Sequence, residues 1–357
     1  HLVNVVATLP GSMPQAARRV VYVLGHYDSM NADKIDGQAD APGANDDASG
    51  TAVVLECCRV LAQKKLDATV VFLCTAGEEQ GLLGAKFHAD NLAARKSYDT
   101  VFALSNDIVG DPSIPFEVPR GSPAPPAASF VRLFSEGIPK NAPAETLARI
   151  RTEGAESDSP SRQLARFVAD VAAREGLAFK PKLIFRQDRF LRGGDHSAFN
   201  DAGFPAVRFT VPGEDYSRQH ASVTTKDGQP YGDLPRFVSG EYIANVARLN
   251  AAAIVHLANA PTPPAHAVLL TKQLETTTSI RWDPSPEPDV AGYEVVVRET
   301  TAPDWTLLST LDAPADLTKP ITLSDLPLSK DNYFFGVRAF DKDGYRSPVS
   351  FCWASKD

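Results

Sequence analysis

The sequence predicts an α/β domain with a mixed, largely parallel central sheet flanked by helices over residues 1–260, followed by a small all-β sandwich over residues 261–357. Up to about residue 260, apolar strand-like runs alternate with helical runs, which is typical of a sheet covered on both faces. After the proline-rich stretch 259–266, short strand-like runs follow one another without a helix. That second pattern is typical of an antiparallel sandwich.

The first region opens on a strand-like run, HLVNVVATLPG. The next predicted strands are residues 19–25, 68–76, 100–105 and 205–211, and the predicted helices are residues 48–63, 81–94 and 241–258. A further helix begins in SPSRQLARFVADVAARE, where Ser159 suits the N-cap and Pro160 the first helical position. The proline-bearing segment 110–129 is too long for a simple connection, so it is either an insertion near the mouth of a site or a passive surface loop.

Four short strand-like runs make up the second region: TTTSIRWDPS, AGYEVVVRET, DWTLLST and NYFFGVRAFD. Over roughly residues 263–351 this region resembles the fibronectin type III family. Six positions match the tyrosine corner, the core tryptophan and two inward-facing residues of that family: Leu326, Pro327, Tyr333, Trp282, Val337 and Ala339. The resemblance implies a fold and no function, because one fold hosts many functions. A surface or protein ligand of this domain therefore stays open.

The composition is that of a soluble globular protein, with 43% hydrophobic and 22% charged residues among 357. No run of about 18 apolar residues predicts a transmembrane helix. The net charge is −8, and no basic stripe stands out to neutralise phosphates, so a nucleic-acid partner is not expected. The four cysteines lack the spacing of a zinc or redox site and are expected to be small buried hydrophobes. The chain opens without a leader sequence, so a signal peptide is expected to have been removed or left out.

Side chains that bind metals or move protons follow the predicted strands at their carboxyl ends. Seven of them come from four strands: His26 and Asp28, Glu78 and Glu79, Asp107, and Tyr216 and His220. Because ligands of open α/β sheets bind beyond the carboxyl ends of the strands, these side chains are expected to share one edge of the sheet. Asp46, in the acidic loop GANDDASGT before a predicted helix, is expected at the same edge.

Each of these residues alone would more often be a surface residue or a helix cap. Together they form a set of nitrogen and oxygen ligands without a thiolate, which suits zinc in an open catalytic site. The sequence therefore predicts a zinc centre at the carboxyl edge of the sheet.

Between residues 26 and 220 the motifs appear in a characteristic order: His-x-Asp, Gly-x-Asn-Asp-Asp-x-Ser-Gly, Gly-Glu-Glu-x-Gly, Asn-Asp, Gly-Asp-His-x-x-Phe and His. This order resembles the co-catalytic di-zinc aminopeptidases, and most closely the secreted bacterial leucyl aminopeptidase type. The resemblance implies the zinc exopeptidase fold with a mixed eight-stranded central sheet. It also implies two Zn2+ ions, peptide substrates and a secreted or periplasmic location.

Carried over position by position, the resemblance implies five metal ligands. His26 and Asp107 would hold one zinc, Glu79 and His220 would hold the other, and Asp46 would bridge both. In that family the peptide bond after this aspartate is typically cis, which implies a cis bond between Asp46 and the residue that follows it.

Three further residues receive catalytic roles from the same resemblance. Glu78 would be the general base that takes a proton from the attacking water. Asp28 would accept the ring N–H of the ligand His26 and so fix its orientation. The hydroxyl of Tyr216 would hold the oxyanion that forms when the carbonyl is attacked.

The sequence also departs from the family. Some relatives place an arginine two residues before the aspartate of Gly-Asp-His to contact the substrate, whereas this chain has Gly193 there, with Arg189 and Arg192 as possible substitutes. Substrate contacts are therefore less well defined than the metal ligands.

The leading prediction is a zinc-dependent exopeptidase that hydrolyses N-terminal residues from peptides. A carboxypeptidase or dipeptidase on the same metal centre is the first alternative, because Arg189, Arg192 and Arg218 offer charges for a substrate carboxylate. A glutaminyl cyclase is less favoured, because that related activity usually works with one zinc. A non-catalytic binding protein is disfavoured, because a scaffold has no need of Glu78 beside all five ligands.

Overall fold

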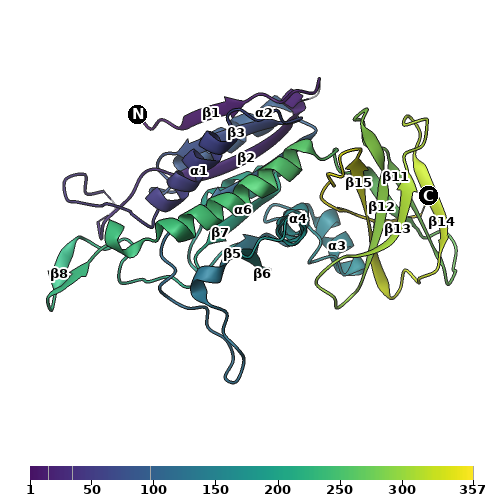
Figure 1. Cartoon of the computed structure of the whole chain (residues 1–357). Coiled ribbons are helices and arrows are strands. Elements are labelled where there is room, and N and C mark those ends of the chain that lie inside the picture. The colour runs from purple at the N-terminus through teal and green to yellow at the C-terminus, as the bar shows by residue number, and fades with distance from the viewer. Residues whose placement is uncertain (15, 34, 97, 357) are drawn as a thin grey trace.

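The computed structural model describes residues 1–14, 16–33, 35–96 and 98–356, and its largest element is a seven-stranded mixed sheet (Figure 1). The strands lie in the order β1-β3-β2-β4-β7-β5-β6. Their bounds are β1 Val5–Leu9, β2 Arg19–His26, β3 Thr69–Thr75, β4 Thr100–Asn106, β5 Phe130–Ser135, β6 Lys180–Ile184 and β7 Ala206–Thr210. β1 pairs antiparallel with β3 and β5 pairs antiparallel with β7, while the other neighbours are parallel. The mixed, largely parallel sheet is confirmed, but the described residues give seven strands rather than the implied eight.

Helices cover both faces of this sheet. The described helices of this region are α1 Ala48–Leu61, α2 Leu83–Arg95, α3 Ala144–Glu153, α4 Pro160–Arg174, α5 Asp195–Asp201 and α6 Gly240–Asn259, with the short 3-10 helices η1 Ala16–Arg18, η2 Ala127–Ser129 and η3 Pro235–Phe237. α1, α4 and α6 pack on one face of the sheet, and α2 and α5 on the other. Along β2, Val21 and Val23 join a core with α1, α4 and α6, whereas Tyr22 and Leu24 join a core with α2 and α5. This division follows from the two-residue period of a strand.

Local sequence signals set the start of α4, as predicted. Ser159 accepts the main-chain N–H of Arg162 at 3.1 Å, and Pro160 is the first helical residue. The segment 110–129, all of it described, contains η2 and no strand. Phe116 of this segment packs edge-on against Phe130 of β5. A position of the segment at the mouth of a site stays a prediction.

Two four-stranded sheets form the C-terminal sandwich, in the orders β14-β11-β10-β17 and β13-β12-β15-β16. Their strands are β10 Ala265–Leu270, β11 Thr278–Asp283, β12 Val290–Glu299, β13 Thr306–Asp312, β14 Ile321–Leu326, β15 Tyr333–Asp341, β16 Ser350–Phe351 and β17 Trp353–Ser355. Trp282, Val337 and Ala339 are fully buried between the sheets, as expected from their positions in the sequence. The likeness to fibronectin type III itself stays a prediction. A separate hairpin, β8 Thr224–Lys226 and β9 Gln229–Tyr231, precedes η3.

The sandwich packs beside α3 and α4 of the first domain (Figure 1). The Trp305 indole N–H donates to Oε1 of Gln163 at 2.8 Å, and Arg338 Nη1 lies 3.2 Å from Oδ2 of Asp170. Charged and polar contacts therefore join the two regions. None of the described helices has the length and apolar character needed to cross a membrane.

Candidate metal centre

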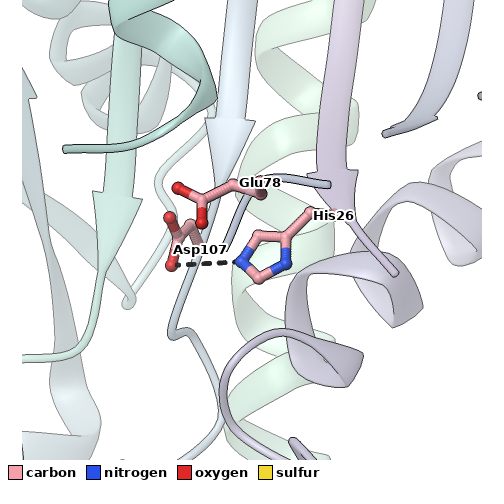
Figure 2. Close-up of side chains that lie close together, drawn as sticks. All are labelled: His26, Glu78 and Asp107. Carbon is pink, nitrogen blue, oxygen red and sulfur yellow. Dashed lines mark ion pairs between the residues drawn. The ribbon is translucent and has the colours of Figure 1, made fainter. Parts of the chain in front are cut away.

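The candidate ligands gather where parallel strands end, at the carboxyl edge of the sheet. His26 is the last residue of β2, Glu78 and Glu79 follow β3, and Asp107 follows β4. Figure 2 shows the side chains of His26, Glu78 and Asp107 turned toward one another at this edge. Parallel strands that start on one side of a sheet also end on one side, so residues far apart in sequence meet there.

Six side chains form two groups that have the composition of metal sites. Within each group the ligand atoms lie within 4.8 Å of one another. The first group is His26, Glu78 and Asp107, and the second is Asp46, Glu79 and His220. The structure therefore brings together all five predicted ligands and the predicted base.

Asp46 lies between the two groups. Its Oδ1 is 3.1 Å from Nε2 of His26, and its Oδ2 is 3.0 Å from Nε2 of His220. The same nitrogen of His220 lies 3.0 Å from Oε2 of Glu79, and Nε2 of His26 lies 4.0 Å from Oδ1 of Asp107. One carboxylate thus faces both histidines with a separate oxygen for each.

The donor set and its unpaired atoms fit zinc. Nε2 of His26 and Nε2 of His220 are buried with carboxylate oxygens 3.1 Å and 3.0 Å away, but none of the described residues gives either nitrogen a well-directed hydrogen bond. Oε1 of Glu79 is buried and also has no hydrogen-bond partner among the described residues. Unpaired polar atoms inside a protein are costly. Burial and the carboxylate of Asp107 raise the pKa of Glu78 to about 9. Cations held by these nitrogen and oxygen donors would satisfy the unpaired atoms and offset the repulsion between carboxylates.

Asp28 contacts the site differently from the prediction. Nδ1 of His26 lies 3.0 Å from the main-chain oxygen of Asp28, whereas the nearest carboxylate oxygen of Asp28 is 3.7 Å away. The carboxylate instead accepts the main-chain N–H groups of Glu78 and Glu79, each at 3.2 Å. The reason is the turn after β2, which brings the main chain of Asp28 to the ring and its side chain to the loop after β3.

Two aspartates that hold the ligand loops were not predicted. Asp47, fully buried, accepts the main-chain N–H groups of His26 at 3.1 Å, Gly50 at 3.0 Å and Ile108 at 3.1 Å, so it joins β2, α1 and the loop after β4. Asp233 accepts the main-chain N–H of Asp46 at 2.8 Å. The acidic run before α1 by itself suggests a helix cap rather than this role for Asp47, and nothing near Asp233 in the sequence marks that residue. The peptide bond between Asp46 and Asp47 is cis, as the resemblance implied.

A buried arginine, also not predicted, holds one of the candidate ligands. Arg208 on β7 is completely buried. Its Nη2 lies 2.8 Å from Oδ1 of Asp107, and its Nη1 lies 3.1 Å from Oδ2 of Asp188. His196 is not part of either ligand group, since its Nε2 faces the main-chain oxygen of Gln187 at 3.0 Å.

A cavity of about 520 Å3 opens over the two groups. Besides candidate ligands it is lined by Met30, Leu82, Leu191, Arg189 and Arg192. Tyr216 is not among the lining residues, and its side chain is 68% exposed. The oxyanion role of Tyr216 therefore stays a prediction without support from its position.

Comparison with known proteins gives a family and several relatives. Residues 4–232 match the profile described as Peptidase family M28. A probable zinc metalloprotease of Leptosphaeria maculans is 42% identical over 98% of this chain and 77% of its own length. A probable zinc metalloprotease of Pyrenophora tritici-repentis is 41% identical over 98% of this chain and 69% of its own length.

Solved structures match more distantly. A zinc aminopeptidase from Bacillus subtilis is 21% identical, with 72% of this chain and 50% of that chain covered and a TM-score of 0.46. An aminopeptidase from Aneurinibacillus sp. strain AM-1 is 23% identical, with 72% and 48% covered and a TM-score of 0.47. The chain thus spans about half the length of these solved structures.

Proposed function

This chain is a zinc metalloprotease of peptidase family M28, and from that premise we propose that it removes N-terminal residues from peptides with the help of two Zn2+ ions. The strongest support is the position of Asp46, whose two carboxylate oxygens face different histidines at 3.1 Å and 3.0 Å. A carboxylate placed in this way suits the bridging ligand of a two-metal site.

In this proposal His26 and Asp107 would hold one ion, Glu79 and His220 would hold the other, and Asp46 would be the ligand that they share. The two carboxylate oxygens of Asp46 face the two histidines, which fits that shared role. When bound, the ions would supply a Lewis acid for the scissile carbonyl and would lower the pKa of a bound water molecule.

Glu78 moves the proton. Its carboxylate belongs to the group with His26 and Asp107, whereas that of the adjacent Glu79 belongs to the other group. As the water oxygen bonds to the carbonyl carbon, the π electron pair moves to the carbonyl oxygen and Glu78 takes the released proton. When the C–N bond breaks, Glu78 delivers that proton to the leaving nitrogen.

The charge of the cavity supports a substrate with a free N-terminus. Asp46, Glu78, Glu79 and Asp107 all line it. A carboxylate oxygen at this cavity that holds no metal ion can accept a hydrogen bond from a cationic α-amine, and such a charged pair is strong where water is excluded. A carboxypeptidase or dipeptidase is the second candidate, and the specific observation in its favour is the guanidinium of Arg192 at the same cavity.

The test is an assay of three substrates. Leucine-4-nitroanilide, its N-acetylated counterpart and a carboxypeptidase substrate with a blocked N-terminus are each incubated with the protein, with and without a zinc chelator. We expect chelator-sensitive cleavage of the free-amine substrate alone. Cleavage of the blocked carboxypeptidase substrate alone would keep the metal centre and overturn the substrate assignment.

The variant Glu78→Gln distinguishes two roles of Glu78, that of general base and that of metal ligand. Because general acid–base catalysis contributes roughly 10²–10⁴-fold, Glu78→Gln should lower kcat by about that factor while bound zinc stays unchanged. If Glu78→Gln instead lost zinc, Glu78 would be a metal ligand and not the base. Its position beside His26 and Asp107 makes this the rival assignment. Glu56→Gln on α1, an exposed glutamate paired with Arg59, is the matched control.

A further inference from the structure

Arg192 is a cation at the cavity over the candidate ligands. It lines the cavity, its side chain is 25% exposed, and its Nη2 lies 3.9 Å from Oδ2 of Asp46. Because Asp46 is the proposed bridge between the two ions, a group that binds this guanidinium lies beside the reacting carbonyl.

No carboxylate among the described residues lies within hydrogen-bond distance of Arg192. Its Nη1 and Nη2 each donate to Oε1 of Gln219 at 3.2 Å, and its one ion-pair contact is the distant one to Asp46. Neighbouring arginines each lie within 3 Å of a carboxylate oxygen: Arg132, Arg189, Arg208 and Arg218. A neutral amide oxygen orients Arg192 without cancelling its charge, so the charge is available to a substrate.

A hydrogen-bonded chain fixes this arrangement. Nε2 of Gln219 donates to Oε2 of Glu214 at 3.3 Å, which turns its amide oxygen toward Arg192. Glu214 is held in turn by Arg132 at 2.8 Å and Arg189 at 2.6 Å. Gln219 and Glu214 are both buried, and Gln219 directly precedes the candidate ligand His220. The loop that carries the ligand thus also holds the guanidinium in place.

From these contacts we infer that Arg192 is a catalytic residue that donates hydrogen bonds to the scissile carbonyl oxygen as it gains negative charge. Gln219 is its positioning residue. The guanidinium is permanently charged and offers several N–H donors, and a prearranged donor at a developing oxyanion is a large source of rate acceleration. The inference rests on the proposed function and gives Arg192 the role that the exposed Tyr216 was predicted to fill.

A substrate carboxylate is the rival ligand, and substrates with and without one separate the two. Leucine-4-nitroanilide has no carboxylate, whereas the dipeptide leucylglycine has one. Loss of an oxyanion donor lowers kcat about 100- to 1,000-fold, so Arg192→Met should lower kcat by that factor on both substrates with little change in KM. Arg192→Lys, which keeps the charge and loses the planar fork, should recover part of the loss.

Binding of a transition-state analogue gives a readout that does not depend on turnover. The aminoboronic analogue of leucine takes a tetrahedral, anionic form, and calorimetry should show that Arg192→Met weakens its binding while the bound zinc per chain is unchanged. Gln219→Leu should weaken it less, and the double variant Arg192→Met/Gln219→Leu should be no worse than Arg192→Met. Arg186→Met is the control, because Arg186 is exposed on the same segment and stacks on Phe190.

Three results would overturn the inference. An unchanged kcat in Arg192→Met would remove Arg192 from catalysis, and a loss confined to leucylglycine would make it a carboxylate-binding residue. A zinc-loaded wild-type protein that cleaves neither substrate would overturn the proposed function instead. In that case, equal binding of the boronic acid by wild type and Arg192→Met would overturn the assignment of Arg192 as well.

Discussion

Oδ2 of Asp28 accepts the main-chain N–H of Glu79 at 3.2 Å. Oδ1 of the same carboxylate accepts the N–H of Glu78, also at 3.2 Å, and the main-chain oxygen of Asp28 faces Nδ1 of His26 at 3.0 Å. One residue therefore joins the end of β2 to the loop after β3. It positions a candidate ligand of one ion, a candidate ligand of the other and the proposed base.

Asp28→Asn should loosen this junction. An amide has one acceptor oxygen, so one of the two N–H groups would meet an NH2 group instead. Mutation of a residue that hydrogen-bonds to metal ligands typically lowers metal affinity or activity by about 10- to 100-fold. We expect a loss in that range for both zinc affinity and kcat/KM. Competition with a chromophoric chelator measures the affinity. Asp36→Asn, on the exposed loop after β2, should behave as wild type, and equal zinc affinity in Asp28→Asn would show that the junction is not needed.

Bound zinc per chain should follow the two-group arrangement. We expect two zinc ions in the wild-type protein and one in His220→Ala, because the second group keeps only Glu79 and the shared Asp46. Asp46→Ala should lose both ions, since both depend on the bridge. Elemental analysis after dialysis measures these ratios. His266→Ala, an exposed histidine in the sandwich, is the control, and full zinc content in Asp46→Ala would refute the bridging role.

A buried ion pair between the two regions should be important for stability. Asp158 and Arg298 are 2% and 4% exposed and are directly hydrogen-bonded across the interface. Removing one partner of a buried pair typically costs about 3–5 kcal/mol, because the other charge stays buried without compensation. Asp158→Asn should therefore lower the free energy of unfolding by about that amount in urea titrations at neutral pH.

The double variant Asp158→Asn/Arg298→Met tests the cause of that loss. The double variant removes both charges of this pair, and only Arg166, whose Nη1 lies 3.6 Å from Oδ1 of Asp158, loses a carboxylate neighbour. It should therefore be less destabilised than the two single variants added together. The exposed pair of Glu56 and Arg59 is the comparison, since surface pairs contribute about 0–1 kcal/mol. A loss in Asp158→Asn as small as that in Arg59→Met would mean that the interface contributes little.

Acid should weaken the sandwich through Glu294. Its carboxylate accepts Nε of Arg338 at 2.7 Å and Nε of Arg346 at 2.9 Å. Burial opposes ionisation, but the two guanidinium groups lower the pKa of Glu294 below its usual value. The unfolded chain then takes up this proton at a higher pH than the folded chain. The stabilisation is therefore complete above the unfolded pKa of about 4.3 and is lost as the pH falls toward the folded pKa.

Urea unfolding at a series of pH values measures this effect. Between roughly pH 6 and pH 3.5, the free energy of unfolding of the wild-type protein should fall more than that of Glu294→Gln. The difference between the variants removes the contributions of carboxylates elsewhere. Glu299→Gln, at the exposed end of the same strand, should keep the wild-type slope. Equal slopes in all three proteins would refute the role of Glu294.

Much of the fold was predictable because its signals are local. The apolar runs that became β2, β3 and β4 and the caps of α4 lie within short stretches of sequence. The convergence of His26, Glu78, Glu79 and Asp107 followed from the parallel direction of those strands. β5 and β6 were not predicted, and neither was the antiparallel pairing of β5 with β7, because pairing direction depends on partners distant in the chain.

The support of the site was the less predictable part. Asp233 holds the main chain of Asp46 across 187 positions of sequence, and a hydrogen bond of that span has no local signal. Arg208 lies within an apolar strand run, where a buried cation is unexpected unless its carboxylate partners are known. The contact of Asp28 with His26 was predicted, but the atoms were not, because the turn geometry decides which oxygen faces the ring.

Asp107 is paired on one side with the fully buried Arg208, which also contacts Asp188. A neutral residue at position 107 would leave the buried guanidinium of Arg208 with one carboxylate partner, Asp188, in place of two. The loss of folding stability on changing Asp107 would therefore come largely from Arg208, which is not a candidate metal ligand. A change of metal ligand at position 107 would therefore be better tolerated if Arg208 were replaced earlier or at the same time. Libraries that vary position 107 alone would carry the cost of a partly uncompensated buried cation, typically about 3–5 kcal/mol, whereas paired libraries at 107 and 208 could avoid that cost.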